Sequence, residues 1–124
     1  MLNWAIIGTG DVVQRLVDNS LFIKNKSIVT SVLSDNLDEA KLYGNKHKIK
    51  FIYSKTKKNL EKILNDKSIN SVYIATPPNS HFFYINFFCK KKINIVCEKP
   101  LVIKKTEIKK LQNLKKKYKF NLFT

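Results

Sequence analysis

The stretch that decides the fold lies near the N-terminus and reads WAIIGTGDVV over residues 4–13. It opens with apolar residues, which are typical of a strand covered on both faces. Gly8 and Gly10 then predict a tight turn, and a helical apolar spacing follows at once. A strand, a glycine turn and a helix N-terminus together cradle an anion, because unpaired backbone N–H groups point at it. A generic strand-to-helix turn with two glycines is the alternative interpretation.

Strand and helix patterns alternate along the chain. The expected strands cover residues 2–7, 28–33, 49–53, 70–75, 93–97 and 120–123, and the expected helices cover 11–22, 37–46, 57–64, about 79–91 and 104–118. Asn36 is the expected N-cap of the second helix, and Asn79 or Ser80 that of the fourth. Right-handed crossovers then predict an α/β fold, a doubly wound parallel six-stranded sheet (a Rossmann fold) in a single domain over residues 1–124. The expected strand order is 3-2-1-4-5-6, with a ligand crevice at the carboxyl ends of the first and fourth strands.

The charge of the chain points at first to nucleic acid, because its 124 residues carry a formal net charge of +15. Among the 24 basic residues, however, Arg15 is the single arginine, whereas base-reading proteins depend on the planar guanidinium. The lysine runs 55–58, 90–92 and 115–117 fall at helix ends or in loops, where solvated lysines are favourable. We therefore expect no nucleic-acid partner and only a general attraction for anionic ligands. A basic nucleic-acid binder is the weakest alternative.

Composition also bounds the location of the chain. No run of about 18 apolar residues is present, and no basic segment precedes an apolar one at the N-terminus. We therefore expect no membrane span, no signal peptide and a cytoplasmic location. Cys89 and Cys97 fall in a helix pattern and a strand pattern, without other clustered metal ligands. The sequence predicts two reduced core cysteines and no metal site.

The end of the second expected strand reads Leu33-Ser34-Asp35-Asn36, where sheets of this type select between NAD and NADP. The Asp35 carboxylate would bond a ribose diol and repel a 2′-phosphate. Ser34 could bond to either cofactor, and no arginine follows it. These residues favour NAD slightly over NADP. Asp35 or Asn36 could instead only cap the following helix.

Polar residues also follow the fourth and fifth expected strands. The fourth strand runs into Ala75-Thr76-Pro77-Pro78-Asn79-Ser80-His81, where the prolines end the ladder and Thr76 could line the crevice. A lone histidine such as His81 is more often a first-turn helix residue than a catalyst. The fifth strand ends in Glu98-Lys99-Pro100, and a lysine beside a reacting hydroxyl could hold it, stabilise an alkoxide or pass a proton. A surface ion pair between Glu98 and Lys99 is the alternative.

The segment Phe82–Cys89 is apolar nearly all round its expected helix. One face must meet the sheet, so an exposed second face would be a poor surface for a monomer. We expect that this face could serve self-association or dock another partner.

Together these motifs, in this order and spacing, resemble the glucose–fructose oxidoreductase/inositol dehydrogenase (Gfo/Idh/MocA) family. The matching pieces are residues 7–10, 71–81 and 96–101, and the resemblance covers only the N-terminal cofactor domain of that family. It implies a Rossmann domain that binds NAD or NADP, and hydride transfer between nicotinamide C4 and a carbinol carbon of a sugar, cyclitol or related diol. It also implies that Lys99 acts at the substrate, that Glu98 and Pro100 shape the nicotinamide end, and that a cis bond precedes Pro100.

The chain departs from the family pattern at two positions. Val13 stands where the third fingerprint residue is normally small, and Lys92 stands where a glycine usually follows the helix. A left-handed backbone at Lys92 would cost about 1 kcal/mol. The resemblance places the cofactor-choosing residue at Ser34, but Asp35 replaces the arginine that accompanies it in NADP-binding members.

The resulting site prediction has two parts. Lys99 is the candidate catalytic residue. The candidate cofactor-binding residues are Gly8, Thr9, Gly10, Asp11, Val12, Ser34, Asp35, Ala75, Thr76, Pro77, Asn79, His81, Glu98 and Lys99. The family's second, substrate-binding domain does not follow Thr124, so we expect little or no activity from this domain by itself. The alternative is a non-catalytic dinucleotide-binding or interaction module left after loss of the catalytic domain.

Overall fold

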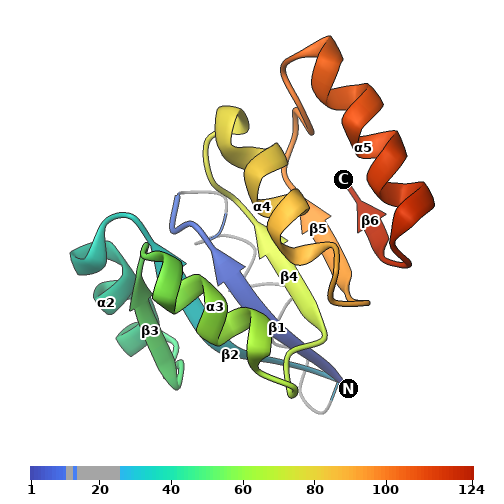
Figure 1. Cartoon of the computed structure of the whole chain (residues 1–124). Helices are drawn as coiled ribbons and strands as arrows, with labels where there is room; N and C mark the ends of the chain where they lie inside the picture. Colours follow the sequence, from blue (N-terminus) through green and yellow to red (C-terminus); the bar gives the residue numbers. More distant parts are fainter. Residues whose placement is uncertain (11–12, 14–25) are drawn as a thin grey trace.

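The computed structural model describes residues 1–10, 13 and 26–124. Six parallel strands form one sheet in the order β3-β2-β1-β4-β5-β6 (Figure 1). The strands are β1 (Leu2–Ile7), β2 (Ser27–Ser34), β3 (Phe51–Ser54), β4 (Ser71–Ile74), β5 (Asn94–Cys97) and β6 (Asn121–Phe123). The predicted fold class and strand order are confirmed. The order reverses at β1, so a crevice opens between the carboxyl ends of β1 and β4.

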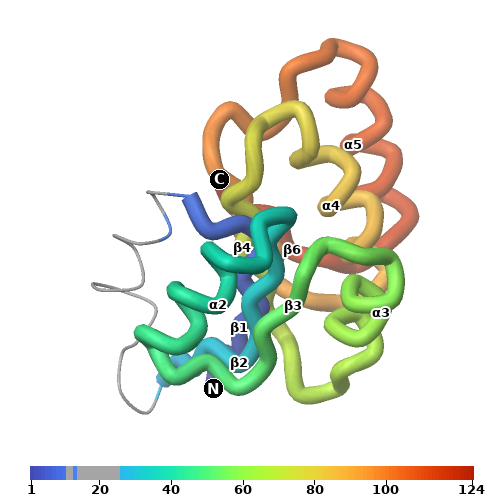
Figure 2. Tube along the Cα trace, turned by 90° about the vertical axis from the view of Figure 1, so that its left-hand side faces the viewer, coloured from blue at the N-terminus to red at the C-terminus, as the bar shows by residue number. Residues whose placement is uncertain are grey.

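The helices lie on both faces of this sheet. They are α2 (Leu37–Lys46), α3 (Lys57–Asn65), α4 (His81–Phe88) and α5 (Lys105–Lys117), with a short 3₁₀ helix, η2 (Pro78–Ser80), before α4. Figure 2 shows α2 on one side of the strands and α3, α4 and α5 on the other. The helix predicted over residues 11–22 falls outside the described residues except for Val13.

Adjacent residues of the central strand serve two separate cores. Ile7 belongs to a large cluster with Ile63 of α3, Ile85 of α4 and Leu111 of α5. Its neighbour Ile6 belongs to a smaller cluster on the opposite face. The members of that smaller cluster are Trp4, Ile6, Val13, Val29, Val32, Tyr43, Ile49 and Tyr73. Val13, which departs from the family pattern, is thus accommodated as a buried core residue.

The N-cap of α2 follows from local chemistry, but that of α4 does not. Asn36 Oδ1 accepts a hydrogen bond from the Glu39 N–H at 3.2 Å, which confirms the cap predicted for α2. Ser80 occupies the N-cap position of α4, yet its side chain makes no cap hydrogen bond. The predicted position of the cap is thus confirmed, but because η2 already places Ser80 in a helical conformation, its side chain does not cap the helix. Its hydroxyl lies instead 2.6 Å from Thr76 Oγ1 and 2.7 Å from the Pro77 carbonyl oxygen.

The end of α4 also differs from the prediction. The helix stops at Phe88 rather than near Lys91, because the Lys91 N–H donates to the Phe88 carbonyl at 3.0 Å and closes the last turn. The Lys91 ammonium then donates to the carbonyl oxygens of Ile63 and Asp66, so it satisfies the end of α3. Burial lowers the pKa of this lysine. Among the described non-glycine residues a positive φ occurs at Lys48 and not at Lys92, so no left-handed strain arises there.

Most of the apolar helix α4 is covered by the fold itself. Tyr84, Ile85 and Phe88 are buried, whereas Phe83 is 51% exposed and stacks on Phe87. The surface left for self-association is therefore centred on Phe83, and self-association remains a prediction. Within the described ranges, none of the helices has the length and apolar character needed to cross a bilayer.

Candidate functional site

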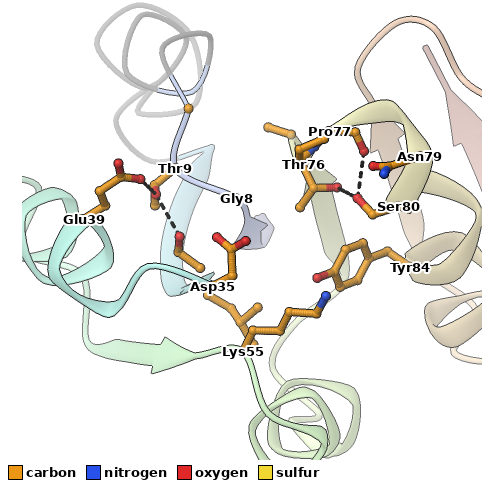
Figure 3. A pocket seen from close by; sticks show the side chains of 14 residues that line it. Gly8, Thr9, Asp35, Glu39, Lys55, Thr76, Pro77, Asn79, Ser80 and Tyr84 are labelled. Carbon is orange, nitrogen blue, oxygen red and sulfur yellow. Dashed lines mark hydrogen bonds between the residues drawn. The ribbon is translucent and has the colours of Figure 1, made fainter.

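A cavity of about 650 Å³ opens at the carboxyl ends of the central strands (Figure 3). Its described lining residues come from the end of β2, from the segments that follow β1, β2, β3 and β4, and from the first turns of α2 and α4. They are Gly8, Thr9, Gly10, Leu33, Ser34, Asp35, Glu39, Lys55, Ala75, Thr76, Pro77, Asn79, Ser80 and Tyr84. This is the crevice that the strand order predicts.

Gly8 is required where the turn after β1 meets the turn after β4. Its φ is +100°, and a Cβ there would lie 2.8 Å from both the carbonyl carbon and the oxygen of Ala75. The Gly8 N–H donates to the Leu33 carbonyl at 2.8 Å, and the Ala75 N–H donates to the Ile7 carbonyl at 2.8 Å. No side chain fits between these backbones, so the first glycine of the motif sets the floor of the cavity.

Gly10 has a different role from Gly8. It is not among the described residues with positive φ, and no described atom lies within 4 Å of the position that its Cβ would take. Gly10 nevertheless lies in the predicted turn, because its carbonyl accepts a hydrogen bond from the Val13 N–H at 3.0 Å. Gly10 lines the cavity, and a pyrophosphate that approached the backbone closely would need such space beside it. Asp11 and Val12, also predicted cofactor residues, lie outside the described residues.

Thr9 and Ser34 are buried in the wall of the cavity. The Thr9 hydroxyl lies 3.0 Å from Ser34 Oγ and 3.1 Å from Glu39 Oε2. Ser34 Oγ also accepts a hydrogen bond from the Asn36 N–H at 3.2 Å. The hydroxyl of Ser34 thus holds the loop after β2 together, which is a tighter engagement than the sequence predicts.

Asp35 presents its carboxylate to the cavity. The side chain is exposed and points into the space between the turn at Gly8 and the turn at Pro77 (Figure 3). Because Asn36 caps α2, the alternative that Asp35 serves as that cap is excluded. A carboxylate at this position is suited to the two hydroxyls of a ribose.

His81 does not line the cavity but lies behind it, fully buried. Its Nε2 lies 2.8 Å from the Thr76 carbonyl oxygen, and its Nδ1 lies 2.9 Å from that of Pro100 and 3.2 Å from that of Leu101. Direct cofactor contact, as predicted, does not fit this burial. His81 instead joins the turn after β4 to the loop after β5.

The loop after β5 lies at the same edge of the sheet, next to the cavity. The Glu98 N–H donates to the Ile74 carbonyl at 3.0 Å, and the Glu98 carboxylate accepts from the Tyr73 hydroxyl. The Lys99–Pro100 peptide bond is cis, as the family resemblance implies. Lys99 is exposed, and neither it nor Glu98 is among the described lining residues. The three motif loops therefore meet at one edge, but the third one extends beyond the cavity.

Both cysteines are free and buried, as predicted. Burial raises the pKa of the Cys97 thiol to about 12 and raises that of Cys89. Cys97 comes directly before Glu98 in the candidate catalytic loop. Because its thiol stays protonated, Cys97 is not suited to act as a nucleophile there.

Sequence reasoning missed five lining residues: Leu33, Glu39, Lys55, Ser80 and Tyr84. Lys55 follows β3 directly, and carboxyl ends of parallel strands share one edge, so its position was available from the strand pattern. The lysine run around it suggested a solvated surface instead. Tyr84 lies one helical turn beyond His81. Its place in the cavity wall depends on the orientation of α4, and it belongs to no sequence motif.

Together, the parallel sheet, the glycine turn and the cavity between β1 and β4 define a dinucleotide-binding Rossmann domain. Comparison with known families agrees: residues 2–124 match the Gfo/Idh/MocA family, described as an oxidoreductase family with an NAD-binding Rossmann fold. The chain belongs to this family.

Individual relatives are longer than this chain. It is 31% identical over 108 residues to an uncharacterized oxidoreductase, YgjR, of Escherichia coli, which covers 87% of this chain and 31% of that protein. A probable dehydrogenase from Thermotoga maritima superposes with a TM-score of 0.86 at 22% identity, over 99% of this chain and 35% of the other. KijD10, a 3-ketoreductase from Actinomadura kijaniata solved with TDP-benzene and NADP, superposes with a TM-score of 0.81 at 18% identity, over 98% and 37%. The chain thus spans about a third of the length of these relatives.

Proposed function

We propose that this chain is the cofactor-binding domain of an oxidoreductase that transfers hydride between a nicotinamide and a hydroxyl-bearing carbon of a sugar, cyclitol or related diol. The observation that supports this most directly is the meeting of the turns at Gly8 and Ala75 beside Gly10, where no described atom lies within 4 Å of the position that a Cβ would take. Such a cradle suits a pyrophosphate, whose charge the backbone N–H groups would neutralise.

Different described residues would bind different parts of the cofactor. Gly8, Thr9 and Gly10 would receive the pyrophosphate, and Asp35 would bond the adenosine ribose. Ala75, Thr76, Pro77 and Asn79 would line the opposite wall of the crevice. Asp11 and Val12 remain candidates at the helix that follows the glycine turn.

The loop after β5 would face the reacting end of the cofactor. When bound, the nicotinamide ring supplies or accepts a hydride at its C4 carbon. The Lys99 ammonium would hold the substrate hydroxyl, stabilise the developing alkoxide and exchange the proton. Glu98, which accepts from Tyr73, would shape the nicotinamide end of the site. The rest of the substrate pocket would come from a second domain, such as the longer relatives have room for.

The charges at the ribose end favour NAD over NADP. Asp35 and Glu39 both line the cavity, and a 2′-phosphate beside them would be repelled. The family is described as NAD-binding, whereas KijD10 was solved with NADP, so the choice of cofactor rests on the charges of this chain. We therefore propose NAD as the preferred cofactor of this chain.

A fluorescence titration of the chain with NADH and NADPH tests the proposal. We expect saturable binding of both, with NADH the tighter ligand. Absence of binding at millimolar NADH would refute the dinucleotide site. Binding without hydride transfer to any sugar or cyclitol, even in the presence of a substrate domain from a longer relative, would favour a non-catalytic binding module instead.

A further inference from the structure

Lys55 places a cation at the end of the cavity that the family motifs do not reach. The backbone N–H of Lys55 donates to the Ser34 carbonyl at 3.0 Å. This bond continues the β2–β3 ladder and fixes the Lys55 backbone beside Asp35. Its side chain lines the cavity, and its ammonium lies 5.6 Å from the centre of the Tyr84 ring and 5.9 Å from that of Phe83. These aromatic faces favour a cation in this position.

Tyr84 adds a second polar group at the same place. Its side chain is 2% exposed, so its ring is fixed within the core. Its hydroxyl nevertheless points toward the cavity, next to the Lys55 ammonium (Figure 3). Leu33 and Ala75 supply apolar surface nearby. An ammonium that donates and a hydroxyl that also accepts therefore stand side by side at an apolar wall.

The positions of the charged residues in the cavity indicate which part of a dinucleotide would lie beside Lys55 and Tyr84. The two carboxylates of the cavity, Asp35 and Glu39, come from the loop after β2 and the first turn of α2. Lys55 follows β3 and Tyr84 lies within α4, and Figure 3 shows both on the other side of Asp35 from Glu39. A 2′-phosphate attached to the ribose beside Asp35 would meet the carboxylates first, whereas a flat base beyond the ribose would meet Lys55 and Tyr84.

We propose that Lys55 and Tyr84 recognise the N1/N6 edge of adenine, an inference that rests on the dinucleotide site proposed above. Adenine offers an acceptor at N1 beside a donor at its N6 amine, and proteins read this edge by hydrogen bonds. Lys55 donates to N1, and the Tyr84 hydroxyl accepts from the N6 amine. The pair selects adenine among bases and adds affinity for NAD and NADP equally.

Titrations with modified dinucleotides test this edge. Nicotinamide 1,N6-ethenoadenine dinucleotide carries a bridge that blocks both N1 and N6, and leaves ribose and pyrophosphate unchanged. The wild-type chain should bind it at least about fivefold more weakly than NAD, the effect of one or two hydrogen bonds. Lys55→Met should weaken NADH and NADPH to the same extent, and together with Tyr84→Phe it should erase the discrimination against the etheno base.

Matched controls separate this effect from the general charge of the chain. Lys58→Met removes the same charge from an exposed position three residues away that does not line the cavity, and should leave both affinities unchanged. Circular dichroism melts verify that each variant is folded. The base contact is refuted if the etheno analogue binds as tightly as NAD, or if Lys55→Met weakens NADPH far more than NADH, which would assign Lys55 to the 2′-phosphate. If the wild-type chain binds none of these dinucleotides, the proposed function fails with it.

Discussion

The two ends of the crevice are built to different degrees. At the end that we propose for adenosine, a cavity is lined by four strand-end loops, and its wall is held by hydrogen bonds among Thr9, Ser34 and Glu39. At the other end, Lys99 is exposed beyond the cavity, on a loop held from behind by His81. The site that we propose for the constant part of the cofactor is thus formed within these residues, whereas Lys99, which we propose to act at the substrate, lies outside it. This difference suggests that the affinity for the dinucleotide and the transfer of hydride depend on separate parts of the molecule.

The largest effect should come from Gly8, where the two halves of the crevice touch. Gly8→Ala forces a Cβ into the Ala75 backbone and a side chain into a positive-φ conformation. We expect a loss of about 2–5 kcal/mol in the free energy of unfolding, together with loss of NADH binding. Urea denaturation measures the first effect. Unchanged stability would show that the turns do not touch as described.

His81 should matter next, because it joins the two ends. His81→Phe leaves the carbonyls of Thr76 and Pro100 without their buried partner, so we expect about 2–4 kcal/mol of destabilisation. Cys97 reports the local effect: its pKa of about 12 makes it unreactive toward a disulfide reagent near neutral pH while it stays buried. Labelling of Cys97 should accelerate in His81→Phe more than the change in global stability explains. His81→Gln keeps a hydrogen-bond donor and should restore part of the protection of Cys97. Equal labelling rates of Cys97 in the wild-type chain and His81→Phe would contradict the role of His81 in joining the two loops.

Asp35 tests the adenosine end alone. Asp35→Ser removes a carboxylate that makes no described hydrogen bond within the protein, so stability should change by less than about 0.5 kcal/mol. NADH affinity should fall about tenfold, and the preference for NADH over NADPH should shrink or reverse. Titration of both cofactors measures this ratio. A constant ratio would remove Asp35 from cofactor choice.

The smallest effect on binding should come from Lys99. Lys99→Met changes an exposed side chain outside the lining of the cavity, so NADH affinity should stay within about twofold of wild type. Any hydride transfer measured with a substrate domain present should fall much further. A large loss of NADH binding would show that the two ends are not separate.

Much of the fold and part of the site could be predicted from the sequence. Alternating patterns gave the strand order, because right-handed crossovers leave few topologies, and Asn36 marked the start of α2 by its capping chemistry. The different roles of Gly8 and Gly10 could not be predicted, since both are glycines and only contact with Ala75 separates them. The burial of His81 depends on a loop nineteen residues later, which a local pattern does not contain. Lys55 was hidden in a lysine run, because charge alone does not show where a strand ends.

We propose that the turns at the carboxyl ends of β1 and β4 enclose a pyrophosphate beside Gly10. A calorimetric titration of NADH into the wild-type chain and into Gly10→Ala, with thermal melts of both, measures this contact. Because a Cβ at Gly10 meets no described atom, we expect equal stability within about 1 kcal/mol and at least a tenfold loss of NADH affinity, roughly the effect of blocking a close backbone contact. Equal NADH affinity in the two proteins, or no saturable binding by the wild-type chain, would contradict it.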